Sequence, residues 1–240
     1  MAVDLEMEVG TLVTPSLHPQ TVASLEDYDD DTKGELAQVV TAFDTAYQGI
    51  AQVFEAREKA KQNPAWTEAA QVIMTQEFAD KVFAKVAGGF DKVSRNLTSG
   101  IAVLEKELSG PMDTAAAGRF GREIRDHVKA LPDGKRTGFV TSAIDRGDFD
   151  AAAAVLAAPA YLSGIDPAMQ ASLLRMWHVK QNPVKEKRLR AMQAALDLVG
   201  QRGGLVFKEL ERAVGAPPHK VKALREAKTA AEKAFVMRGA

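Results

Sequence analysis

The chain contains four histidines, at positions 18, 127, 178 and 219, and no cysteine. Among them only His127 shares an expected helix face with a carboxylate one turn away, Glu123, and that is the spacing of an acid–histidine half-site for a metal ion. A di-metal bundle needs this element twice, with further glutamates facing it, and the chain has no second copy. We therefore interpret Glu123 and His127 as a surface pair and expect no metal and no cofactor.

Two further groups could bind ions, and neither has the surroundings that such a site needs. The stretch GRFGREIR at 118–125 has glycines three apart and three arginines, but a phosphate loop needs a preceding strand or more glycines. The run Asp29-Asp30-Asp31 lacks the glycine-spaced loop of a calcium site and suits the start of a helix. No nucleophile elbow is present, so we expect no catalytic residues, although a triad can assemble from distant parts of a chain.

The C-terminal stretch VFKELERAVGAPPHKVKALREAKTAAEKA, residues 206–234, carries the strongest binding signal. A helix that ends at Gly215, a short turn and a basic helix together resemble a helix-turn-helix, although Glu211 stands where that motif usually has alanine. Lysine and arginine are also the usual side chains of a solvated helix face. The candidate DNA-binding residues are His219, Lys220, Lys222, Arg225 and Lys228.

The elements that would position these residues are helices. From 31 to 62 apolar residues alternate at intervals of four and three, which predicts a helix with a heptad seam. Asn63-Pro64 ends it and begins a second long helix, to about 109, and the short connection predicts an antiparallel hairpin. The candidate self-association seam is Leu36, Val40, Phe43, Tyr47, Ile50 and Phe54.

Beyond Gly110-Pro111 the expected helices are shorter, at about 113–131, 135–145, 149–158 and 166–180. A long helix then starts at Asn182-Pro183, keeps a heptad seam as far as Leu210, and precedes a final helix to about 237. The predicted fold is all-α: a long antiparallel hairpin, a bundle of shorter helices and a long C-terminal helix pair. The predicted domains are an extended arm at 1–30, the hairpin at 31–110 and a helical domain at 111–240.

The charge of the chain is balanced overall and uneven along its length. It holds 31 basic and 32 acidic residues. Residues 1–60 have 12 acidic against 3 basic side chains, a net of −9, and residues 180–240 have 14 basic against 6 acidic, a net of +8. This charge asymmetry has two interpretations. It can steer association between copies or with a charged partner, or the protein can be a dipolar monomer whose ends have no electrostatic partner. No signal peptide or membrane span is expected.

Three segments carry a resemblance: IRDHVKALP at 124–132, GFVTSAIDRGDFDAAAAVLAAPAYLSGI at 138–165 and LRAMQAALDLV at 189–199. They resemble helical proteins encoded among the virion-structure genes of tailed phages and prophages. The similar region, 121–199, is about a third of the chain. The resemblance implies a virion-associated or assembly protein, in the virion or the host cytoplasm, and it assigns no role to any single residue.

Three functions remain possible at this point. The first is a non-enzymatic structural or assembly protein that forms homo-oligomers or docks on capsid, portal or other virion proteins. The second is a DNA-binding protein that uses the basic C-terminal region. The third is an enzyme whose site is assembled from dispersed groups, which is the least supported, because no cluster of ionisable residues is foreseeable.

Overall fold

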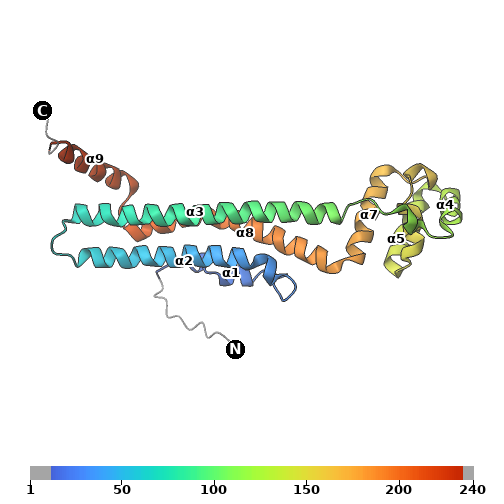
Figure 1. Cartoon of the computed structure of the whole chain (residues 1–240), viewed down its shortest axis with the longest axis horizontal. Coiled ribbons are helices and arrows are strands. Elements are labelled where there is room, and N and C mark those ends of the chain that lie inside the picture. The colour runs from blue at the N-terminus through green and yellow to red at the C-terminus, as the bar shows by residue number, and fades with distance from the viewer. Residues whose placement is uncertain (1–11, 235–240) are drawn as a thin grey trace. The chain divides into compact units, whose positions relative to one another are not determined.

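The structure is a computed structural model, and it describes residues 12–234 of the 240-residue chain. These residues form α-helices and short 3-10 helices and no strand (Figure 1). The all-α fold class is therefore confirmed. Within the described residues, no helix combines the length and the apolar composition that crossing a membrane requires.

The described helices fall into two compact units whose boundaries cut through two of them. Among the described residues, unit 1 takes 12–98 and 191–234, and unit 2 takes 99–190. The helices α3 (Glu68–Glu107) and α8 (Pro183–Val214) each contribute to both units. This division differs from the expected boundary at Gly110-Pro111. Gly110-Pro111 ends a helix, which is a local event in the chain. The boundary between the two compact units instead depends on which helices, distant in the sequence, pack together.

In unit 1, α2 (Lys33–Lys61) packs against the first part of α3. The rings of Phe43 and Phe90 lie 5.3 Å apart, and the side-chain amide of Asn96 donates to Gln38 over 2.7 Å. Gln38 precedes Phe43 on α2, whereas its partner Asn96 follows Phe90 on α3. The two helices therefore run antiparallel in this unit (Figure 1). The buried face of α2 is broader than a heptad seam, because Val39, Ala46 and Val53 are buried beside it.

The expected self-association seam lies inside unit 1 and is not a free surface. Leu36, Phe43 and Ile50 are fully buried, Tyr47 is nearly so, and Val40 and Phe54 are half-buried. This interpretation of the seam is corrected for a simple reason: apolar residues at heptad spacing pack equally well on helices of the same chain. Packing within the subunit therefore takes up four of the six side chains, and Val40 and Phe54 are partly covered.

The predicted extended arm is also corrected over the part that the structure describes. Residues 12–30 include the 3-10 helix η1 (Pro15–Leu17) and α1 (Gln20–Ala23), not an extended chain. Val13, Leu17 and Val22 are buried, and the ring of His18 meets the ring of Tyr47 edge-on at 4.9 Å. The apolar side chains were too few to show a 3.6-residue period but enough to hold the segment on α2. Residues 1–11 of the predicted arm lie outside the described residues.

Unit 2 is built around α6 (Phe149–Leu156), in which every residue from Ala151 to Leu156 is buried. Three helices surround it: α4 (Gly121–Ala130), α5 (Asp133–Arg146) and α7 (Pro167–Gln181). Alanine removes side-chain bulk on all sides, so neighbouring helices approach α6 closely. The expected helix at 113–131 is two elements, η2 (Thr114–Ala117) and α4, because Gly118 adopts a φ of 65° that ends the first.

Two arginine side chains donate hydrogen bonds to carbonyl groups at helix ends and turns of unit 2. Arg136 donates to the carbonyl groups of Leu131, Gly164 and Lys129 over 2.9–3.0 Å. Arg125 donates to the carbonyl of Ala154 over 2.8 Å. The terminal carbonyls of a helix have no partner within it, so these side chains supply donors that the backbone lacks.

Candidate functional site: a groove between α3, α8 and α9

The last described helix, α9 (Pro218–Ala234), follows a turn whose backbone conformation favours glycine at position 215. Gly215 ends α8 with a φ of +72°, and its N–H donates to the carbonyl of Glu211 over 3.1 Å. A Cβ at this position would also meet the guanidinium group of Arg57, the mobile end of a long side chain. The left-handed backbone at Gly215 sets the direction in which α9 leaves α8.

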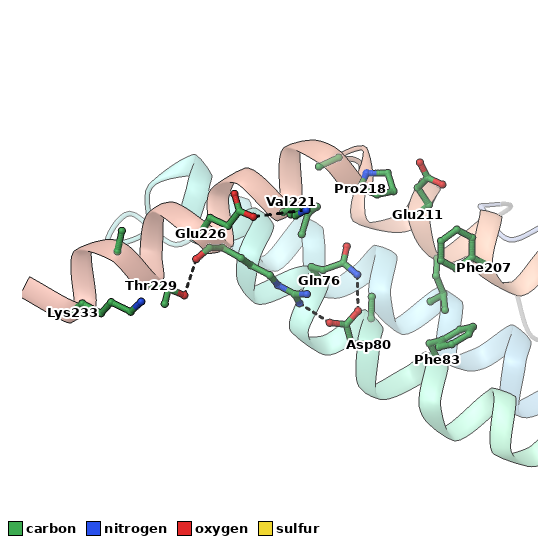
Figure 2. A pocket seen from close by; sticks show the side chains of 16 residues that line it. Gln76, Asp80, Phe83, Phe207, Glu211, Pro218, Val221, Glu226, Thr229 and Lys233 are labelled. Atoms are coloured by element: carbon green, nitrogen blue, oxygen red, sulfur yellow. Dashed lines mark hydrogen bonds and ion pairs between the residues drawn. The ribbon is translucent and has the colours of Figure 1, made fainter.

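A groove with a volume of about 690 Å³ lies between the unit 1 parts of α3 and α8 and the helix α9. We call it the α9 groove. Figure 2 shows the side chains of the three helices that line it. Its lining residues are Gln76, Ala79, Asp80, Phe83, Phe207, Leu210, Glu211, Ala216, Pro218, Val221, Lys222, Arg225, Glu226, Thr229, Ala230 and Lys233.

One end of the α9 groove is apolar and carries two exposed aromatic rings. Phe83 is 42% exposed and Phe207 is 56% exposed. Their rings meet edge-on with centroids 6.2 Å apart. Thr229 and Lys233 lie toward the other end (Figure 2). Aromatic side chains are costly to leave in water and are common anchors at binding surfaces, so this end is suited to receive apolar side chains.

Ion pairs attach α9 to α3. The ammonium nitrogen of Lys220 lies 3.1 Å from a carboxylate oxygen of Glu68. A guanidinium nitrogen of Arg225 lies 2.5 Å from a carboxylate oxygen of Asp80, and the ammonium nitrogen of Lys228 lies 3.5 Å from one of Glu77. Of the described residues of α9, Val221 is the buried one. Exposed ion pairs contribute only about 0–1 kcal/mol each, so α9 is attached to α3 by little buried apolar surface and three weak ion pairs.

The structure thus brings the five candidate DNA-binding residues together on one helix, with most of their charges already matched. Three pair with α3 as described, and Lys222 lies 3.9 Å from Glu226 in α9 itself. His219 is exposed. Phosphate contact depends on cations that can exchange their counterions for DNA. A cation that already faces a carboxylate must give up that partner first, so the geometry weakens the DNA-binding interpretation.

The acidity of Asp80, on the α3 wall of the groove, is changed by its neighbours. Burial acts to raise the pKa of Asp80, but hydrogen bonds from Arg225 and Gln76, together with the charge of Arg225, outweigh it. The pKa of Asp80 therefore lies below its ordinary value. A lowered pKa in the folded state stabilises the fold above the unfolded pKa of about 4, and the effect is lost as the pH falls through the folded pKa.

Replacement of Asp80 by asparagine should loosen α9 in a pH-dependent way. At neutral pH we expect the amide protons of α9 to exchange several-fold faster in Asp80→Asn than in the original chain, because the pair with Arg225 is lost. The ratio of the two exchange rates should fall to one as the pH drops through the lowered folded-state pKa of Asp80, below about 4, because both side chains are then neutral. Hydrogen-exchange mass spectrometry measures this ratio, with Asp44→Asn on the exposed face of α2 as the control.

The remaining candidates from the sequence take structural positions. Glu123 and His127 are exposed, the His127 ring lies 5.5 Å from the ring of Phe139, and no three His, Asp or Glu side chains among residues 12–234 gather as they would around a metal ion. The arginine at 125 of the GRFGREIR stretch caps Ala154. The acidic run begins α2 as expected, with Asp30 2.6 Å from Lys33.

The aromatic pair of the groove was missed as a site by sequence reasoning. Phe83 follows the buried Val82, and Phe207 follows the buried Val206. Each is therefore an aromatic residue one position outside the buried stripe of its own helix. This position beside the buried stripe was the sequence signal for a binding surface. A large apolar residue on the polar side of an amphipathic helix is not covered by the core of its own unit and can contact another partner.

Comparisons of the chain with protein-family models, with curated proteins and with solved structures gave no match.

Proposed function

We propose that this protein is a non-enzymatic structural or assembly protein that binds a partner protein through the α9 groove. The observation that carries the proposal is the pair of exposed rings, Phe83 and Phe207, at the apolar end of a groove formed by three helices. Grooves of this kind receive the apolar face of a helix or of an extended segment. The virion setting rests on the resemblance of residues 121–199, and the partners proposed with it are capsid, portal or other assembly proteins.

The charges around the groove define the chemistry of the partner segment. Lys233 has no ion-pair or hydrogen-bond partner among the described residues, and Lys222 has only the 3.9 Å contact with Glu226. Both lie on the α9 wall of the groove. A partner segment with carboxylates beside its apolar side chains would match these cations while filling the space near Phe83 and Phe207. Glu211 adds a carboxylate near Phe207, so the proposed partner is an amphipathic segment whose own carboxylates lie toward Lys222 and Lys233 and away from Glu211.

Selection of short random peptides on the immobilised full chain tests this proposal. We expect the enriched peptides to combine aromatic or aliphatic side chains with Asp or Glu. The change Phe207→Lys should weaken their binding by about 30-fold or more, because loss of an interface anchor costs about 2 kcal/mol or more. Fluorescence anisotropy with the selected peptides, labelled with a dye, measures the change in Kd.

The matched control is Tyr161→Lys, which replaces a 72% exposed aromatic residue of unit 2. It should leave peptide binding within about twofold, because an isolated surface change rarely costs more than about 0.5 kcal/mol. Peptides that bind the two variants equally well, or an enrichment for basic sequences, would exclude the groove as the binding site.

DNA binding through α9 is the weaker alternative, because Lys220, Arg225 and Lys228 face carboxylates of α3. It requires retention of duplex DNA at low salt that Lys222→Glu abolishes and that falls steeply as salt rises. No retention at low salt would remove it.

A further inference from the structure

We propose that the α9 groove binds a second copy of this chain about a two-fold axis, so that Lys233 of each copy reaches Phe207 and Glu211 of the other. The inference rests on the proposed function, since it names the partner that the groove takes. It is drawn from the charges of the lining that have no partner, from their positions, and from the side chains beside them.

The first argument is the charge of the lining. Its charged residues are Asp80, Glu211, Lys222, Arg225, Glu226 and Lys233. Two ion pairs described above, one between α9 and α3 and one within α9, use four of them. The side chains of the other two, Glu211 and Lys233, have no ion-pair or hydrogen-bond partner among residues 12–234. The lining is therefore neutral as a whole and offers one unpaired charge of each sign.

The second argument is the placement of these two charges. Glu211 lies on α8 at the end of the groove that holds Phe207, whereas Lys233 lies at the other end, on α9 (Figure 2). The part of α9 between Pro218 and Lys233 is about 23 Å long at 1.5 Å per residue. A partner that pairs with both charges must carry a cation and an anion at the same separation and in the reverse order. A second copy related by a two-fold axis has this spacing, because residue i then meets residue j and j meets i.

The third argument is the chemistry around Glu211. Phe207 and Glu211 are four positions apart on α8, so they are neighbours on one face of that helix. The Phe207 ring is 56% exposed, and Phe83 lies edge-on beside it. The alkyl chain of a lysine can cover such a ring while its ammonium group reaches the carboxylate one turn away. Lys233 of the second copy supplies this lysine, and the same face of α8 is an apolar side chain with a carboxylate, as the proposed partner requires.

The extent of the contact predicts a reversible dimer. A face about 23 Å long and two helices wide, or about 20–24 Å, covers roughly 500 Å² of each copy. The two copies together then bury roughly 1,000 Å², which is the size of a weak protein–protein interface. We therefore expect the dimer to form as the protein concentration rises and to dissociate on dilution.

Charge reversal in the full chain tests the proposal, with sedimentation velocity over a series of protein concentrations. Glu211→Lys and Lys233→Glu should each raise the Kd of the dimer about tenfold or more, because the two-fold axis turns two attractive contacts into two repulsive ones. A one-to-one mixture of these two variants should dimerise again, since each copy then carries the charges that pair with those of the other. Recovery on mixing is the result that a general loss of stability cannot produce.

The matched control is Lys208→Glu, which makes the same change of charge on the exposed surface of α8 outside the groove. It should leave the Kd within about twofold. Circular dichroism of each variant checks that it remains helical.

Four results would overturn the proposal: a chain that stays monomeric at every concentration, a dimer that neither variant weakens, a mixture that does not recover, and growth into larger assemblies. The last would mean head-to-tail contacts instead of a two-fold axis. The peptide-binding test of the groove needs no second copy. A monomeric chain that binds peptides, and binds them less tightly after Phe207→Lys, would therefore reject this inference and retain the proposed function.

Discussion

Replacement of Phe43 by alanine should lower the free energy of unfolding of unit 1 by about 3–5 kcal/mol, the cost of removing a large aromatic side chain from a packed core. Phe43 is fully buried, and its ring lies 5.3 Å from the ring of Phe90 on α3. The cavity left behind would border α2 and α3 at once, so neither helix could close it alone. Hydrogen exchange of the α2 amides should accelerate by a factor of about 100 or more, at about 1.4 kcal/mol per tenfold.

The matched control for this change is Phe207→Ala, which shortens the same side chain type where it is 56% exposed. It should cost about 1 kcal/mol or less, because most of that ring already contacts water. The pair also tests the interpretation of the heptad seam. If Phe43→Ala left exchange unchanged and instead lowered the mass of the protein in solution, the seam would be an intersubunit surface and the assignment of Phe43 to the core would be wrong.

Replacement of Arg136 by methionine should destabilise unit 2 by about 2–5 kcal/mol, since each donor lost to a partly buried carbonyl costs about 1–3 kcal/mol and two of its three hydrogen bonds are partly buried. The Arg136 side chain is 20% exposed, and it joins the end of α4, the α4–α5 connection and the turn before α7 through three carbonyls. Methionine keeps the length of the side chain and removes every donor. Urea unfolding followed by Trp177 fluorescence, in a Trp66→Phe background, reports on unit 2 alone, because these are the two tryptophans of the chain.

Two further variants establish that the donors matter rather than the charge. Arg136→Lys keeps the charge but cannot hold three carbonyls in the planar arrangement of a guanidinium group, so it should recover less than half of the loss. Arg146→Met, at the exposed end of the same helix, should cost about 1 kcal/mol or less. Full recovery by lysine would contradict the proposed role of the three hydrogen bonds.

The two long helices show how much of the fold was readable in advance. Their expected limits, 31–62 and 64–109, differ from Lys33–Lys61 and Glu68–Glu107 by four residues or fewer at each end. Periodic burial and proline breaks act on neighbouring residues, so they are visible in the sequence. The segment 12–30 was misjudged because its three buried side chains form no period of their own and are buried only by contact with α2.

The candidate site depended much more on tertiary structure. The sequence showed the basic residues of α9 but not the carboxylates that neutralise them, because Arg225 and Asp80 are 145 residues apart. Phe83 and Phe207 likewise belong to different helices, and only packing of α3 beside α8 brings their rings together.

By itself, then, the sequence determined that this protein is helical, where its long helices begin and end, and which face of each is apolar. Those properties follow from interactions within a few residues, which the order of side chains specifies directly. The tertiary structure alone decided that most of the heptad seam packs within the subunit, that cations of α9 face carboxylates of α3, and that a groove with two exposed aromatic rings lies beside α9. Those properties depend on which helices, distant in the sequence, pack against one another. Hydrophobic burial has no preferred direction, so the apolar pattern of one helix does not specify which other helix it packs against.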